Sequence, residues 1–157
     1  MEAEIRTRAS APPHLEVLQA LEAAADALRA ATEARLPPPL SYSQFQVMRD
    51  FLRFGDGASP AEIATRLRMS RGATTHLLQK MEARGWIRLE GDARDRRRKH
   101  VRLTSKGAEM ARAAASAVRP GMEQLRTRLN DNYLRDGAAF LRDLGARLDE
   151  LRSGDGP

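Results

Sequence analysis

Residues 59–90, SPAEIATRLRMSRGATTHLLQKMEARGWIRLE, decide the fold because two helix starts are followed there by a change of hydrophobic period. Ser59 and Glu62 are spaced as a capping box, with a proline at the first helical position between them. After a three-residue connection, Ser70 caps a second predicted helix, which Gly85 ends. The stretch therefore predicts two short helices joined by a tight turn.

Beyond Gly85 the hydrophobic period changes from 3.6 to 2, which indicates β-strands. Ile87 and Leu89 alternate with charged residues, and so do Val101 and Leu103. The polar residues 91–99 separate the two runs. Two half-buried strands joined by such a loop predict an open hairpin, and two helices followed by a hairpin describe a winged helix-turn-helix.

The flanking segments carry helical apolar stripes. We therefore predict a mainly α fold with a small β-hairpin wing, in which Pro120 breaks or kinks one C-terminal helix. The predicted organisation is a flexible arm over 1–13, an N-terminal dimerisation helix over 14–40, the winged helix-turn-helix region over 41–106, C-terminal dimerisation helices over 107–152 and a flexible tail over 153–157.

Composition excludes several classes of site. The 157 residues include 45 Ala plus Leu but only 7 Val plus Ile, which favours helix. The chain has no Cys, so disulfides and thiolate metal sites are excluded. His14, His76 and His100 fall on three separate predicted elements, so we expect no metal and no cofactor. No run is apolar enough to span a membrane and the N-terminus lacks a secretory signal, so we expect a soluble, cytoplasmic protein.

The positive charge is concentrated in one part of the chain. The net charge is +6, yet residues 66–106 alone hold 13 basic and 4 acidic residues, a net of +9. The rest of the chain carries 14 basic and 17 acidic residues. Such a concentration is typical of a surface that binds a polyanion, and 24 of the 27 basic residues are Arg, which pairs bidentately with phosphate and guanine.

Two sets of polar residues are therefore candidates for DNA contacts. The recognition helix offers Ser70, Arg71, Thr74, Thr75, His76, Gln79 and Lys80 to a major groove. The wing offers Arg94, Asp95, Arg96, Arg97, Arg98 and Lys99 to the backbone or a minor groove. Asp95 is interpreted as the partner that holds Arg97 in a bidentate pair.

Residues from about 41 to 107 resemble the multiple-antibiotic-resistance regulator (MarR) family. The most specific match is the Asp-x-Arg of Asp95 and Arg97, which is followed by Leu-Thr-x-x-Gly. The other matching segments are 59–64, 69–75, 78–87 and 101–107. The resemblance implies a homodimer that binds an inverted-repeat operator in double-stranded DNA. It also implies that the homodimer releases this DNA when a small phenolic or anionic effector binds between the dimer helices and the DNA-binding part.

The apolar stripes give dimerisation a separate argument. A winged region of about 60 residues cannot cover the stripes of the terminal helices. We expect the dimer interface to contain Leu15, Leu18, Leu21, Met122, Leu125, Leu129, Phe140, Leu144, Leu148 and Leu151. The alternative is that these stripes pack on each other within one chain.

Two other functions remain as alternatives to a ligand-responsive repressor. An enzyme is disfavoured because no nucleophile–base spacing, metal cluster or phosphate-binding loop is present in the sequence. A winged-helix adaptor that binds protein or RNA is the second alternative, although an adaptor does not need a net charge of +9 on its helix and wing.

Overall fold

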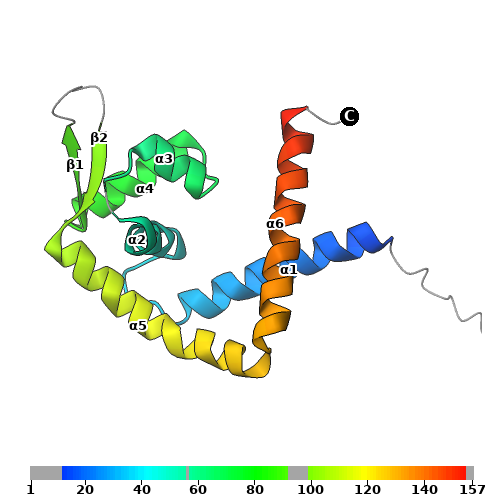
Figure 1. The fold of residues 1–157 in the computed structure, drawn as a ribbon. Helices are drawn as coiled ribbons and strands as arrows, with labels where there is room; N and C mark the ends of the chain where they lie inside the picture. Colours follow the sequence, from blue (N-terminus) through cyan, green and yellow to red (C-terminus); the bar gives the residue numbers. More distant parts are fainter. Residues whose placement is uncertain (1–11, 56, 92–98, 155–157) are drawn as a thin grey trace, which may run out of the picture. The chain divides into compact units, whose positions relative to one another are not determined.

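The computed structural model describes residues 12–55, 57–91 and 99–154. The elements in chain order are α1 (Pro13–Glu33), α2 (Tyr42–Phe54), α3 (Pro60–Arg66), α4 (Arg71–Ala83), β1 (Ile87–Gly91), β2 (Lys99–Leu103), α5 (Ser105–Arg128) and α6 (Asp131–Ser153) (Figure 1). They form two compact units, residues 1–115, here called the winged unit, and residues 116–157, the C-terminal unit. The predicted class, mainly helical with one hairpin, is confirmed.

The core of the winged unit lies where α2, α3, α4 and the hairpin meet (Figure 1). Its fully buried side chains come from all of these elements. They include Val47, Met48, Ile63, Leu78, Met81, Trp86, Ile87 and Val101. Burial of apolar area of this kind is the main stabilising term, at roughly 25 cal/mol per Å².

Side-chain caps fix where the helices begin, as the sequence predicts. Ser59 and Glu62 form a complete capping box, and the bond from Ser59 lowers the pKa of the Glu62 carboxyl below its ordinary value. Ser41 caps α2 in the same way. Ser70 caps α4 by accepting from the Ala73 N–H at 3.2 Å. Each such cap is worth about 1 kcal/mol.

The hairpin pairs β1 with β2 in antiparallel register, with Leu89 opposite Val101. Ile87 and Val101 are buried, so the predicted alternation is confirmed. The loop between α2 and α3 joins this sheet, because the Gly57 N–H donates to the Val101 carbonyl at 2.8 Å and the Val101 N–H donates to the Ala58 carbonyl at 2.9 Å. The loop thus closes the free edge of β2.

The start of α5 is joined tightly to the end of α4. The Thr104 N–H donates to the Trp86 carbonyl at 3.0 Å, and the Thr104 hydroxyl donates to the Gly85 carbonyl at 2.6 Å. Gly107 lies so close that a Cβ there would be 1.8 Å from the Trp86 carbonyl oxygen. Only glycine allows this approach of helix to backbone.

The C-terminal unit contains the rest of α5 and all of α6. Of the two predicted outcomes at Pro120, a break or a kink, the break is wrong, since α5 continues through Pro120 to Arg128. Proline removes one N–H and its ring crowds the carbonyl four residues earlier, which disfavours a helix interior without always ending the helix. Asn130 begins α6 as its N-cap, where its side-chain oxygen accepts from the Tyr133 N–H at 2.8 Å.

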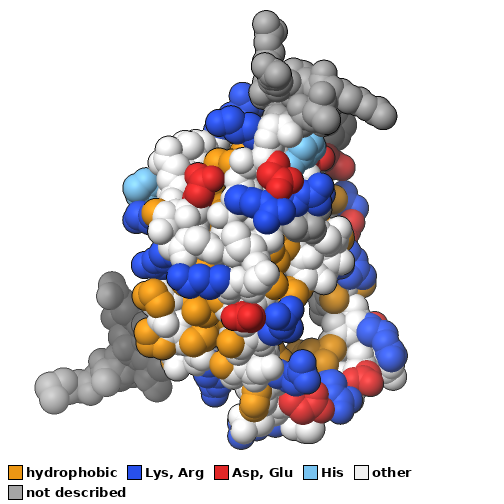
Figure 2. Space-filling model, turned by 90° about the vertical axis from the view of Figure 1, so that its left-hand side faces the viewer, with side chains coloured by type: hydrophobic (Ala, Val, Ile, Leu, Met, Phe, Trp, Pro, Cys, Tyr) orange, Lys and Arg blue, Asp and Glu red, His pale blue; other side chains and the backbone are white. Residues whose placement is uncertain are grey.

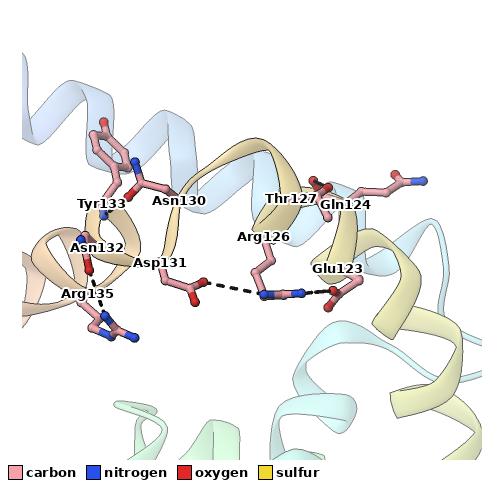
Figure 3. Close-up of polar contacts among 9 residues, drawn as sticks. All are labelled: Glu123, Gln124, Arg126, Thr127, Asn130, Asp131, Asn132, Tyr133 and Arg135. Carbon is pink, nitrogen blue, oxygen red and sulfur yellow. Dashed lines mark hydrogen bonds and ion pairs between the residues drawn. The ribbon is translucent and has the colours of Figure 1, made fainter.

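One arginine spans the corner between α5 and α6 (Figure 3). The Arg126 guanidinium bonds Glu123 at 2.7 Å and lies 3.8 Å from Asp131. The hydrogen bond to Glu123 is the main reason why the pKa of Arg126 is raised and that of Glu123 is lowered.

Among the residues that the structure describes, no helix is long and apolar enough to cross a membrane.

Candidate nucleic-acid interface

The exposed face of α4 carries most of the predicted recognition residues. Arg71, Thr75, His76, Gln79 and Lys80 are all exposed. The Thr75 hydroxyl donates to the Arg71 carbonyl at 2.9 Å, which leaves its oxygen free to accept. Ser70 lies at the N-terminus of the same helix, where its hydroxyl serves as the cap. One helix therefore presents donors, acceptors and positive charge on one surface.

Thr74 was predicted on the recognition face, and the structure corrects this prediction because the residue is buried. Its side chain is 1% exposed, and its hydroxyl donates to the Ser70 carbonyl at 3.0 Å. The reason is helical spacing, because Thr74 shares an inner stripe with Leu77, Leu78 and Met81. Thr74 is therefore a core residue and does not lie on the exposed face of α4.

The wing is described only at its base. Lys99 is exposed at the start of β2. The other predicted wing residues, and with them the pair proposed between Asp95 and Arg97, lie outside the described residues: Arg94, Asp95, Arg96, Arg97 and Arg98. Figure 2, seen from the side on which Figure 1 draws the hairpin, shows Lys and Arg side chains scattered among hydrophobic and other side chains.

The base of the wing carries a charged cluster that the sequence reasoning missed. Glu90 bonds Arg88 on its own strand and, at 3.4 Å, Arg102 on the partner strand. The bond from Arg88 contributes most to lowering the pKa of Glu90, so this carboxylate stays charged. The alternation that places Ile87 and Leu89 inward also places Arg88, Glu90 and Arg102 on the opposite face, and this pattern could have revealed the cluster.

His100 connects this face to the loop before α3. Its Nδ1 lies 2.7 Å from the Gly57 carbonyl oxygen. A carbonyl oxygen only accepts, so Nδ1 carries the proton. A Cβ on Gly57, whose φ is +96°, would lie 2.9 Å from the Arg102 guanidinium. The loop and the wing base are therefore fitted closely to each other.

Arg84 fixes the C-terminal end of the recognition helix. Its guanidinium donates to the Pro39 carbonyl at 2.9 Å and to the Gln44 side chain at 3.0 Å, and it lies 5.0 Å from the centre of the Trp86 ring. These contacts join the end of α4 to the chain segment before α2. The orientation of the recognition face thus depends on residues 40 positions away in sequence.

The predicted dimerisation residues differ in exposure. Leu18, Leu21, Leu129 and Leu144 are half-buried. The exposed ones are Leu15, Met122, Leu125, Phe140, Leu148 and Leu151, the last at 74%. The side chains of Tyr133, Leu141 and Leu28 are also exposed, and these residues were not predicted in the dimer interface from the sequence.

No group of three or more metal-ligating side chains occurs within the described ranges.

Comparison with known proteins finds similar sequences and structures among transcriptional regulators. Residues 39–98 match the family model described as "MarR family". The Escherichia coli K12 protein "Transcriptional repressor MprA" is 32% identical over 92 residues, which is 59% of this chain and 52% of that protein. The chain spans about half the length of the curated relatives it matches.

Solved structures share the fold. MepR of Staphylococcus aureus in a DNA-binding conformation aligns with a TM-score of 0.75 and 20% identity over 84% of this chain and 98% of that one. A mutant MarR of Escherichia coli, solved in complex with operator DNA, aligns with a TM-score of 0.72 and 21% identity over 83% of this chain and 95% of that one. At such identities the likeness shows the winged-helix fold alone.

Proposed function

We propose that this chain is a transcriptional regulator of the MarR family that binds double-stranded DNA in a sequence-specific manner, because its residues 39–98 match the model of that family. The observation that carries the proposal is the exposed polar face of α4. Thr75 and Gln79 are placed to meet base edges, and Arg71 and Lys80 to meet guanine or phosphate.

The surroundings of α4 support this role. An α-helix fits the major groove, which is about 12 Å wide. The capping of α4 by Ser70 and its attachment through Arg84 hold the helix rigidly, and rigid presentation reduces the entropy lost on binding. The basic residues of the wing base and Lys99 lie on the same unit and provide charge for the flanking backbone.

The regulator acts as a homodimer on an inverted-repeat operator. The support is the apolar surface of α6, where Phe140, Leu141, Leu148 and Leu151 are 40–74% exposed. Such a row of exposed apolar side chains is typical of an interface. A two-fold axis would place two recognition helices about 34 Å apart, one turn of DNA.

We further propose that the chain is a repressor that releases DNA when a small phenolic or anionic effector binds. The name of the relative MprA supports repression, and the effector rests on the family resemblance. The exposed polar and basic face of α4 favours duplex binding over the alternative of an adaptor for protein or RNA.

Selection of bound fragments from a pool of genomic DNA tests the proposal. We expect enrichment of inverted repeats and a footprint of two protected regions one turn apart. Replacement of Thr75 or Gln79 by Ala should cost roughly 1–3 kcal/mol of discrimination at one base pair in each half-site. A pool without an enriched sequence, or salt-independent binding to a protein, would contradict the proposal.

A further inference from the structure

A recess of about 550 Å³ opens in the winged unit, lined by the C-terminal half of α2 and the end of α3. This volume lies within the range of small-molecule sites. The recess is lined by Gln46, Arg49, Asp50, Arg53, Phe54, Arg66 and Leu67.

The lining of the recess has a clear excess of positive charge. Three arginines face one acid, Asp50, which leaves a net charge of +2. Asp50 is 7% exposed and accepts from Arg66 at 3.1 Å, so its charge is already paired. Within the described parts of the chain, neither Arg49 nor Arg53 has an acidic partner. Two guanidinium groups are therefore available on one side of the recess.

The position of these two arginines is unfavourable for the free protein. Arg49 and Arg53 are four residues apart on α2, and like charges at this spacing destabilise a helix by about 0.2–0.5 kcal/mol. Arg53 lies in the last turn, where the helix dipole favours a cation, but Arg49 lies one turn earlier. An anion bound between them would remove the repulsion.

The recess also has an aromatic wall. The Phe54 side chain is 58% exposed, although it is large and apolar. The guanidinium groups of Arg53 and Arg66 lie 4.8 and 5.3 Å from the centre of its ring. Two cations therefore lie within cation–π distance of the ring, and the exposed ring leaves apolar surface beside these charged groups.

We propose that this recess is a binding site for an oxyanion, a carboxylate or phosphate group held by Arg49 and Arg53 beside the Phe54 ring. Guanidinium groups bind both anions with paired hydrogen bonds. The bound oxyanion belongs either to a small acid or to the DNA backbone. The DNA backbone is a candidate source because Arg66 and Leu67 immediately precede the turn to α4. The backbone source rests on the proposed function, whereas the small acid does not.

The test compares two double variants of the full chain that lose the same charge. Arg49→Gln with Arg53→Gln removes the site, and Arg112→Gln with Arg119→Gln, both exposed on α5, is the control. The first arm titrates each protein with inorganic phosphate and with benzoate by calorimetry. The second arm measures duplex affinity against salt concentration. Circular dichroism verifies folding, and Arg49→Gln alone replaces the double variant if it is unfolded.

We expect the site variant to weaken saturable anion binding at least tenfold if the source is a small acid. If the source is the DNA backbone, its salt slope should fall by about 2 while the control slope does not change. Equal behaviour of the two double variants in both arms would overturn the proposal. A chain that binds no duplex at all would refute the proposed function, and the titration would still decide the oxyanion site.

Discussion

Replacement of Gly107 by Ala should loosen the joint between the recognition helix and α5. The added Cβ would lie 1.8 Å from the Trp86 carbonyl oxygen and 2.7 Å from its carbon, both backbone atoms that cannot rotate away. The start of α5 must therefore move by about 1.6 Å to restore an ordinary van der Waals contact of 3.4 Å. This movement would break the bonds that Thr104 makes to Trp86 and Gly85.

The magnitude follows from these contacts. Overpacking of a close contact costs about 1–3 kcal/mol, and each lost hydrogen bond costs about 1 kcal/mol. Alanine gains back about 1 kcal/mol of helix propensity. We expect a net loss of about 3 kcal/mol in the free energy of unfolding.

Urea unfolding followed by circular dichroism measures this loss. With a slope of about 2 kcal/mol per molar urea, the midpoint should fall by about 1.5 M. Gly137→Ala is the matched control, because Gly137 is exposed in α6 and a Cβ there meets nothing within 4 Å. The control should gain about 0.5–1 kcal/mol. If Gly107→Ala unfolds at or above the wild-type midpoint, the close approach is not a constraint.

Three further predictions concern the wing base, a helix cap and the apolar surface. Glu90→Gln should tighten duplex binding several-fold and steepen its salt slope by about 1, because the carboxylate no longer pairs with Arg88 and Arg102. The control Glu109→Gln, which is exposed on α5, should change neither the affinity nor the salt slope. Equal effects of the two substitutions on duplex binding would contradict this reasoning. Ser59→Ala should lower the free energy of unfolding by about 1 kcal/mol at pH 7. The Ser59 hydroxyl contributes to the lowered folded pKa of Glu62, although the Ser59 backbone N–H contributes more and survives the substitution. The share of the hydroxyl is present above the unfolded pKa of about 4.3 and is lost as the pH falls through the folded value, so the difference in urea midpoint should shrink somewhat in acid; a constant difference would refute the coupling. Leu148→Asp should convert a dimer to a monomer in sedimentation velocity, and a variant that stays dimeric would remove Leu148 from the interface.

Local chemistry made much of the fold predictable from sequence. Caps such as Ser59 and Ser70 act on backbone groups three residues away, so their spacing is visible in the chain. The change of period after Gly85 predicted the hairpin for the same reason. Thr74 was misplaced because residue type was weighed above helical spacing, although its distance from Leu77 and Leu78 indicates the inner face.

The part of the fold and of the site that the sequence did not predict depends on contacts between segments that are distant in the chain. Arg84 meets Pro39 and Gln44, and Arg66 meets Asp50, and no spacing in the sequence predicts either pair. The recess at the ends of α2 and α3 was missed for this reason. The sequence left open whether Pro120 breaks or kinks its helix, and the structure excludes the break, because the effect of a proline depends on the surrounding turns as well as on its own ring.

Fluorescence anisotropy of a selected operator duplex, titrated with the chain across a salt series, tests the central claim most directly. The account predicts tight binding of two chains per duplex, a steep loss of affinity with salt, and a large loss of preference over random duplex when Thr75 and Gln79 are both replaced by Ala. Equal affinity for operator and random duplex in the wild-type chain, or an unchanged preference in the double variant, would contradict it.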